Sequence, residues 1–373
     1  MSTVNLLPMA QQDLLWQVTR NPEAKTDAER AELLKDPGFG KVFTDHMVDI
    51  CWSEKGGWHR PRVQPYGPIA LDPAAAVLHY AQEVFEGLKA YRHADGSIWT
   101  FRADQNAARM QRSARRLALP ELPAEYFIDS LKQLIAVDGD WVPTADETSL
   151  YLRPFMFAKE AFLGVRPAAK VNYYLIASPA GAYFSGGITP LEIWLSSRYT
   201  RAGHGGMGQA KTGGNYASSL VAQAEAYENG CQQVLFLDAQ EGTYLEELGG
   251  MNIVLVTKDN HLITPDSDSI LEGITLDSIL QLAVDRGYTV AQRRVSLEEW
   301  RSGVESGEIV EAFACGTAAV VTPISVVRND EVEIRMPQRS DDERIALSLR
   351  QELTGIQYGR IDDRHGWMLR LDA

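Results

Sequence analysis

The sequence predicts a mixed α/β (α+β) fold with two unequal domains. Three observations support this prediction: the length of 373 residues, short apolar runs that alternate with helical stripes, and a cluster of chain-breaking residues near the middle. Single cores stop growing at about 250–300 residues, so a longer chain tends to divide. Apolar residues make up 45% and charged residues 23% of the chain, which excludes a disordered protein, a collagen and a coiled coil.

The overall charge restricts the possible partners. The chain has 36 Lys and Arg against 50 Asp and Glu, a net charge of −14. An acidic surface repels phosphate backbones and anionic lipids, so we expect neither nucleic acid nor membrane as a partner. No run reaches the ~18 apolar residues that a membrane span needs. The first residues also lack the basic start of a secretory signal.

The cysteines and histidines indicate a cellular location and argue against a metal. Cys51, Cys231 and Cys315 lie far apart in the chain. An odd and sparse set of this kind favours reduced thiols and a cytoplasmic protein. Because the sequence has no CxxC and no paired histidines, we expect no metal site.

The first half of the chain mixes strands and helices. Residues 1–40 are polar and contain several Pro and Gly residues, and we interpret them as a loosely attached arm. The apolar spacing over 104–117 predicts a helix, with Asp104 as its N-cap. The apolar run 171–178 predicts a strand.

A group of chain breakers at 185–190 predicts an interdomain linker. It would separate a small N-terminal domain at 1–184, which includes the arm, from a larger domain at 191–373.

The second half has clearer element boundaries, because Gly commonly follows a helix end and Ser-x-x-Glu commonly opens a helix. The predicted elements are strands at 191–196, 233–238, 252–257 and 309–315, a helix at 215–229 closed by Gly230, a helical stripe at 276–283 closed by Gly287, and a helix opened by Ser296–Glu299.

Lys211 has unusual neighbours in sequence. It is the only formal charge between Ala202 and Ala224, and half of the residues from Gly203 to Gly214 are glycine. An amine with no charged neighbour is suited to act as a neutral nucleophile, as Schiff-base lysines do. A solvated lysine in a flexible loop fits the composition equally well.

A phosphate-binding P-loop is a competing interpretation. Residues 205–212 fit GxxxxGK[ST] except at Ala210, and Val234–Asp238 resembles the strand and Asp that hold magnesium. The second Gly of that motif lets the backbone wrap the phosphate, whereas Ala places a Cβ there. Gly213 and Gly214 would also be poor first residues for the helix that follows.

The segment Gly206–Ala217 resembles the lysine motif of the branched-chain amino acid aminotransferases, which are pyridoxal-phosphate enzymes of fold type IV (the D-amino acid aminotransferase-like fold). The resemblance extends from about residue 39 to residue 359. The other matching segments, in order, are Phe39–Met47, Phe85–Tyr91, Tyr151–Pro154, Gly181–Phe184, Glu247–Asn252, Gly316–Ala318 and Ile356–Gly359.

The resemblance implies a role for Lys211 and for one of two adjacent acids. Lys211 would hold pyridoxal 5'-phosphate as an aldimine and move the proton during transamination, which makes the larger domain at 191–373 the cofactor-binding domain. Glu247 would pair with the pyridine nitrogen. Adjacent strand residues point to opposite faces, so Glu246 would not reach the same ring, and the alternative is that both are a solvated pair. Gly250 stands where many family members have Thr.

The resemblance also implies phosphate-binding residues. Ile274 and Thr275 open a helix, whose N-terminus suits an anion, and Thr317 adds a hydroxyl. Arg109 matches the family's phosphate arginine. Arg112 and Arg116 share its helix face, and we interpret them as solvated.

Tyr216 would bind the cofactor's ring oxygen, or would be a core aromatic residue of the helix that follows Lys211. The aromatic residues that match the family's substrate pocket are Phe39, Tyr80, Phe85, Tyr151 and Tyr183. Ordinary core packing is the alternative for all of them.

Two polar contacts would orient the substrate. Tyr80 and the backbone amides of Thr317 and Ala318 would receive the substrate α-carboxylate. Arg153 would bind the distal carboxylate of glutamate by a fork, or would instead pair with a structural acid.

The sequence is therefore interpreted as a branched-chain amino acid transaminase. It would move the amino group of leucine, isoleucine or valine to 2-oxoglutarate in a ping-pong cycle, giving the branched 2-oxo acid and glutamate. Family members are homodimers in which the partner's small domain helps to close the pocket, and we expect the same here. Other interpretations are a D-amino acid transaminase or aminodeoxychorismate lyase of the same fold type, a P-loop protein, and a non-catalytic scaffold.

Overall fold

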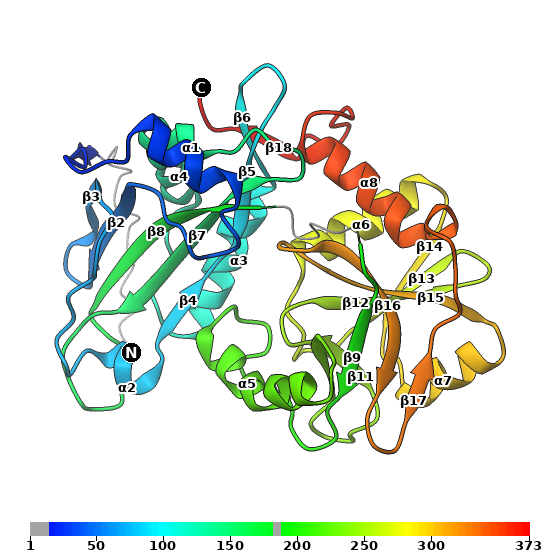
Figure 1. Cartoon of the computed structure of the whole chain (residues 1–373). Coiled ribbons are helices and arrows are strands. Elements are labelled where there is room, and N and C mark those ends of the chain that lie inside the picture. Colours follow the sequence, from blue (N-terminus) through cyan, green and yellow to red (C-terminus); the bar gives the residue numbers. More distant parts are fainter. Residues whose placement is uncertain (1–14, 182–187) are drawn as a thin grey trace.

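Two nine-stranded sheets, each with its own helices, form the protein (Figure 1). The computed structural model describes residues 15–181 and 188–373. Residues 185–187 of the predicted linker lie outside this part. Within it, no helix combines the length and apolar character that a membrane crossing requires. No group of three or more His, Cys, Asp or Glu side chains in the same ranges is arranged to hold a metal ion.

The first sheet is largely antiparallel, with the strand order β1-β3-β2-β8-β7-β5-β6-β18 and with β4 paired to β7. Its strands are β1 (Gln17–Val18), β2 (His46–Ser53), β3 (Gly57–Pro65), β4 (Glu83–Phe85), β5 (Leu88–Arg92), β6 (Ile98–Phe101), β7 (Ser149–Ala158), β8 (Lys170–Ala180) and β18 (Met368–Arg370). Its helices are α1 (Asp27–Lys35), α2 (Ala76–Tyr80), α3 (Ala103–Arg116), α4 (Ala124–Asp138) and the 3₁₀ helix η1 (Gly139–Trp141).

The second sheet is mixed, with the order β11-β10-β9-β16-β15-β12-β13-β14 and with β17 paired to β16. Its strands are β9 (Leu191–Leu195), β10 (Gln233–Leu237), β11 (Leu245–Leu248), β12 (Asn252–Thr257), β13 (His261–Pro265), β14 (Thr289–Arg293), β15 (Ile309–Gly316), β16 (Val320–Arg328) and β17 (Glu333–Arg335). Its helices are α5 (Gly213–Glu228), α6 (Ile274–Asp285), α7 (Leu297–Glu305), η2 (Asp341–Glu343) and α8 (Ile345–Gln357).

The two halves share part of their apolar core. One core lies between the first sheet and the helices α3 and α4. Another core joins α6 and α8 to the second sheet, and it also contains Tyr91 and Phe101 of the first sheet. The C-terminal strand β18 pairs with β6 of the first sheet, although it belongs to the predicted larger domain at 191–373. The domain division therefore stays a prediction.

Most of the predicted elements are confirmed, and the exceptions have local causes. The residue before α3 is Arg102 in the left-handed conformation (φ 48°), so Asp104 lies in the first turn and is not the N-cap. Ser296 does cap α7 by accepting from Glu299 N at 3.0 Å. The Glu299 carboxylate binds Arg293 instead of completing the capping box.

Helix α5 begins at Gly213, two residues earlier than predicted, and Gly213 and Gly214 are suitable first residues. The Gly213 amide donates to the carboxylate of Glu83, which also accepts from Thr212 Oγ1 at 3.3 Å. A Cβ at position 213 would overlap that carboxylate. Glycine thus lets an acid from the first sheet cap the helix that follows Lys211.

The described part of the N-terminal arm, residues 15–40, is more firmly attached than predicted. The Trp16 indole donates to Asp129 on α4, and Leu33 and Leu34 pack against the first core. The Asn21 amide donates to the His46 ring at 2.8 Å. These contacts are between residues distant in sequence, so the polar composition of the arm did not reveal them.

Candidate active site

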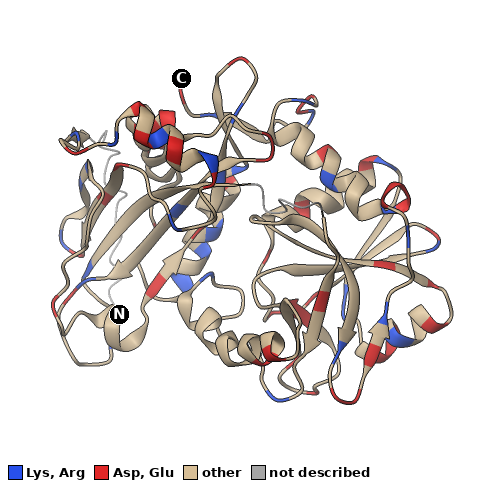
Figure 2. Cartoon of the chain, viewed as in Figure 1, with Lys and Arg blue, Asp and Glu red and all other residues tan. Residues whose placement is uncertain are grey.

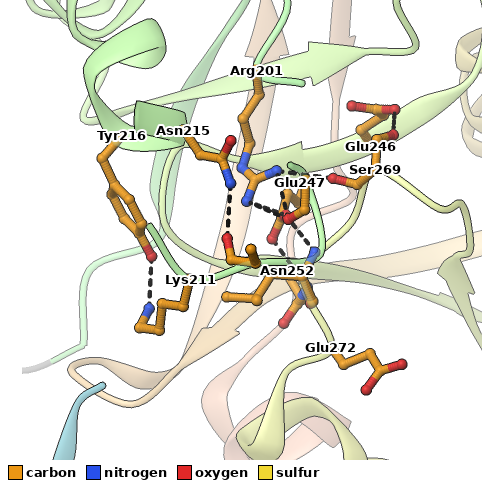
Figure 3. A network of polar contacts seen from close by, with 12 residues as sticks. Arg201, Lys211, Asn215, Tyr216, Glu246, Glu247, Asn252, Ser269 and Glu272 are labelled. Carbon is orange, nitrogen blue, oxygen red and sulfur yellow. Dashed lines mark hydrogen bonds and ion pairs between the residues drawn. The ribbon is translucent and has the colours of Figure 1, made fainter. Parts of the chain in front are cut away.

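Lys211 lies in the glycine-rich loop between β9 and α5, where the two halves of the protein meet. Its amide donates to Ser113 Oγ on α3 at 2.9 Å, and its carbonyl accepts from the Phe85 amide on β4 at 3.0 Å. Its Nζ donates to the Tyr216 hydroxyl at 2.7 Å and lies 4.9 Å from the centre of the Phe85 ring (Figure 3). The first sheet and α3 thus fix the backbone of a lysine that belongs to the second half of the chain.

One cavity, which we call the Lys211 cavity, brings together all seven residues expected to bind the cofactor. Its lining residues are Arg109, Arg201, Lys211, Tyr216, Glu247, Gly249, Gly250, Met251, Asn252, Leu271, Gly273, Ile274, Thr275, Cys315, Gly316 and Thr317. The expected residues come from separate regions of the chain, so the fold and not local sequence brings them together.

Glu247 on β11 is buried beside this cavity. Its Oε1 accepts from the Leu271 amide at 2.8 Å and forms an ion pair with Arg201 Nη2 at 2.9 Å, and its Oε2 accepts from Asn252 Nδ2 at 3.2 Å. Burial raises the pKa of Glu247 to about 7, although Arg201 and the Leu271 amide act to lower it. The site therefore holds a carboxylate whose charge depends on its hydrogen-bond donors.

Glu246 points away from Glu247, as expected for adjacent strand residues (Figure 3). It accepts from Ser269 Oγ and lines a different cavity of about 250 Å³. The alternative of a solvated pair is wrong, because both residues are buried. Burial also raises the pKa of Glu246.

The N-terminus of α6 lies at another side of the Lys211 cavity, where Ile274 and Thr275 line it. Gly273, the residue before the helix, has no side chain with which to cap it. The first backbone amides of a helix carry a partial positive charge and suit an anion when no side chain caps them.

Arg109 is buried in the same cavity and is held by a fully buried acid. Its Nε and Nη2 each donate to Glu86 at 2.8 Å, and its Nη1 donates to the carbonyl of Glu272 at 2.9 Å. A guanidinium has five N–H groups, so two remain for a ligand. Burial is the largest single influence and acts to raise the pKa of Glu86, but the charge and hydrogen bonds of Arg109 together with Lys211 and Asn106 outweigh it, so this pKa lies below its usual value.

Arg112 and Arg116 are exposed, as expected for solvated residues, but they also bind the second half of the chain. Arg112 Nη2 pairs with the Glu272 carboxylate at 2.8 Å. Arg116 donates to the carbonyls of Gly205 and Gly206 at 3.0 and 3.1 Å. Figure 2 shows the row of basic residues along α3. This face of α3 thus connects to both the glycine-rich loop and the start of α6.

Aromatic contacts extend from Lys211 toward Arg153. The rings of Phe85 and Tyr216 lie 5.0 Å apart, as do those of Tyr151 and Phe39. The Arg153 guanidinium lies 4.9 Å from the Phe85 ring, and its Nη2 donates to the Tyr151 hydroxyl at 3.1 Å. Among the described residues, Arg153 forms no ion pair and its buried Nε has no hydrogen-bond partner. The charge of Arg153 does act to lower the pKa of one acid, Glu83, which burial raises, so a structural acid partner stays an alternative prediction.

The remaining expected substrate residues are placed differently. Tyr80 does not line the Lys211 cavity; its hydroxyl donates to the carbonyl of Leu163 and its side chain is 37% exposed. The Ala318 carbonyl accepts from Lys89 Nζ at 2.8 Å. Tyr183 lies outside the described residues.

The sequence analysis missed two polar residues of the cavity. Arg201 contacts Glu247, and Asn252 contacts both Glu247 and the carbonyl of Leu271. Arg201 is the last charge before the uncharged window around Lys211. A lone arginine beside this uncharged window could have indicated a buried ion pair. Only the fold shows that its partner is Glu247.

Comparison with known proteins agrees with this geometry. Residues 83–327 match the model of the class IV amino-transferase family. The chain is 59% identical to the branched-chain-amino-acid aminotransferase of Mycobacterium tuberculosis H37Rv, over 97% of this chain and all of that protein. Two solved structures are similar over 87% of this chain and 99% of theirs. One is the Escherichia coli branched-chain amino acid aminotransferase (26% identity, TM-score 0.70), and the other is the T.th. enzyme complexed with N-(5'-phosphopyridoxyl)-L-glutamate (27% identity, TM-score 0.67).

The glycine-rich loop gives a first prediction. A Cβ at Gly208 would overlap the backbone of Ser269, so Gly208→Ala should push the loop away and displace Lys211. Overpacking of this kind costs about 1–3 kcal/mol. We expect weaker binding of pyridoxal phosphate, by about tenfold or more, in a spectroscopic titration.

Gly203→Ala is the matched control, because a Cβ there meets only Ala239 at an ordinary 3.6 Å. Equal cofactor affinities for the two variants would show that the contact with Ser269 does not position the loop.

Proposed function

The chain belongs to the class IV aminotransferases, and we propose that it moves the amino group of leucine, isoleucine or valine to 2-oxoglutarate. The single observation that carries this proposal is the Lys211 cavity. It combines a lysine on a fixed backbone, a buried carboxylate and an uncapped helix N-terminus in a chain that is 59% identical to a branched-chain-amino-acid aminotransferase. Family membership excludes the P-loop interpretation of residues 205–212.

The residues present fit pyridoxal 5'-phosphate. The two unused N–H groups of Arg109, the first amides of α6 and the hydroxyls of Thr275 and Thr317 would hold its phosphate. Glu247 would pair with the ring nitrogen, and Tyr216 would bind the ring oxygen. When bound, this cofactor supplies an electron-accepting ring that carries the amino group from one substrate to the next.

Lys211 would hold the cofactor through Nζ and would move a proton to and from the substrate α-carbon. The Tyr216 hydroxyl at 2.7 Å fixes the direction of Nζ, and the contacts with Ser113 and Phe85 fix the backbone. Such preorganisation removes the entropy cost of orienting the amine in each cycle.

The same pocket must accept an apolar and an acidic side chain in alternate half-reactions. The rings of Phe85 and Tyr151 offer apolar surface to a branched side chain. Arg153 lies against both rings and pairs with no described acid, so it can bind the distal carboxylate of glutamate. The T.th. enzyme, a structural relative, was solved with a phosphopyridoxyl-glutamate.

We propose that the working protein is a homodimer in which Tyr80 completes the pocket of the partner. Tyr80 does not line its own cavity; its hydroxyl donates to the carbonyl of Leu163, and the exposed apolar side chains of these two segments form a patch. The patch consists of Leu78 (58% exposed), Tyr80 (37%), Leu163 (67%) and Val165 (88%). Exposed apolar groups of this kind mark protein–protein contacts.

A cytoplasmic location is also proposed. Cys51, Cys231 and Cys315 are all free thiols in the structure. Free thiols persist in a reducing compartment.

Lys211→Ala should lose the covalent link and reduce turnover by about 10²–10⁴-fold or more, because no other amine would replace its proton transfer. Borohydride reduction followed by peptide mapping identifies the lysine that holds the cofactor. Lys89 is the internal control, since burial and the nearby Arg350 lower its pKa to about 8. Label found on Lys89 would overturn the assignment of Lys211.

Arg153→Met should affect the two half-reactions unequally. Loss of a charge-assisted fork leaves the glutamate carboxylate desolvated, at a cost of about 2–4 kcal/mol or about 30- to 1,000-fold in rate. Single-turnover kinetics with 2-oxoglutarate should show this loss, whereas leucine should react nearly as before. Equal losses on both sides would mean that Arg153 only supports the pocket.

Val165→Asp should weaken self-association by about 100-fold or more, because an unpaired carboxylate would be buried in the interface. Sedimentation at graded concentration measures the change. Leu220→Asp is the control, since Leu220 is 66% exposed on α5, outside the patch. An unchanged dimer in Val165→Asp would place the interface elsewhere.

A further inference from the structure

Arg201 joins three separate segments of the chain beside Glu247. It lies between β9 and the glycine-rich loop and is 5% exposed. Its Nη1 donates to the carbonyl of Ser269 at 2.9 Å, and Nη1 and Nη2 both reach the carbonyl of Gly208, at 3.5 and 3.3 Å. Its Nη2 lies 2.9 Å from Glu247 Oε1 (Figure 3). One guanidinium thus touches the lysine-bearing loop, the segment before α6 and the buried acid.

Four ionisable groups on the surrounding elements interact electrostatically with Glu247. They are Arg201 after β9, Lys211 on the glycine-rich loop, Glu246 on β11 and Cys315 on β15. Burial raises the pKa of Cys315 to about 12, so this thiol is uncharged near neutral pH. Glu246 adds negative charge and therefore favours the protonated form of Glu247.

The two cations differ in their relation to Glu247. Lys211 directs its Nζ to Tyr216, and in the proposed function this amine is used to hold the cofactor. Among the described ion pairs, the one that includes Glu247 is formed by Arg201. Arg201 is therefore the constant positive charge in contact with this carboxylate.

The burial of Glu247 makes that charge necessary. A carboxylate taken out of water becomes neutral unless a cation or N–H donors stabilise its charge. A neutral Glu247 could not keep a pyridine nitrogen protonated, because it would have no negative charge to offer.

We propose that Arg201 is a positioning residue that keeps the Glu247 carboxylate ionised and fixes it at the ring-nitrogen end of the Lys211 cavity. This role deepens the function proposed above and rests on it. The charge of Glu247 should depend on Arg201 even when no cofactor is bound. This dependence can therefore be measured on the cofactor-free protein.

The raised pKa of Glu247 determines whether the free energy of unfolding rises or falls with pH. Glu247 has an ordinary pKa of 4.5 and a folded-state pKa of about 7, so between these values the folded state binds more protons than the unfolded state. The free energy of unfolding should therefore fall as the pH rises from about 4.5 to about 7, and this contribution should level off above that. Without Arg201 the folded-state pKa rises further, and the fall should continue at higher pH.

The experiment is urea unfolding of the cofactor-free protein between pH 5 and 9, with wild type, Arg201→Met and Arg201→Gln. Gln can still bind the carbonyl oxygens of the neighbouring loops, so it is the second variant if Met prevents folding. Each variant should lose up to tenfold in its folding constant per pH unit above pH 7, where wild type has levelled off. Arg201→Lys, which keeps the charge, should restore most of the wild-type profile.

The Glu247→Gln background identifies the titrating group. There, the extra pH dependence caused by Arg201→Gln should vanish. If it persists, a group other than Glu247, such as Glu246, is titrating and the proposal is wrong. Identical pH profiles for wild type and both Arg201 variants would overturn it as well.

The loaded enzyme gives an independent measurement. In Arg201→Gln the rate of the leucine half-reaction should recover as the pH rises, whereas a purely structural role would lower the rate equally at every pH. Borohydride trapping on Lys211 in wild type tests the proposed function separately, so a failure of the Arg201 proposal leaves that result unchanged.

Discussion

Lys211 reaches the interior of the protein because the backbone of the glycine-rich loop packs directly against the backbone at Ser269. Only glycine at position 208 permits this approach. A backbone buried in this way must find partners for its amides and carbonyls. Arg201 and Arg116 bind its carbonyls, and Ser113 and Phe85 bind Lys211 itself. The position of the amine thus depends on a loop held from several sides by distant segments.

Two buried ion pairs lie at the Lys211 cavity, Arg109–Glu86 and Arg201–Glu247. Buried pairs contribute little net stability, since desolvation offsets much of their attraction. In each pair, one member keeps hydrogen-bonding groups that can bind a ligand. Arg109 retains two N–H groups, and Glu247 retains a carboxylate whose ionised form Arg201 stabilises. The counter-charges let the protein fold around a cationic and an anionic group before any ligand neutralises them.

The sequence predicted what local pattern determines. The strand at 252–257, the glycine at 287 and the lysine motif are local features, and the structure contains them all. The missed features depend on contacts between distant residues. Gly213 opens α5 because Glu83, 130 positions earlier, caps it. Arg201 matters because Glu247 lies beside it in space, and β18 returns to a sheet formed by the first half of the chain.

A single chain brings together the residues expected to bind the cofactor, but it does not bring together those expected to bind the substrate. All seven expected cofactor residues line one cavity of this chain, whereas among the described substrate residues only Thr317 lines it. Arg153 contacts both Phe85 and Tyr151, but Tyr80 lies in an exposed apolar patch and its hydroxyl donates to the carbonyl of Leu163. A tyrosine that recognises a carboxylate must face a pocket, and in the proposed dimer that pocket is the partner's. The tertiary structure of one chain is then sufficient to form the cofactor site. The substrate pocket, by contrast, is complete only in the proposed dimer.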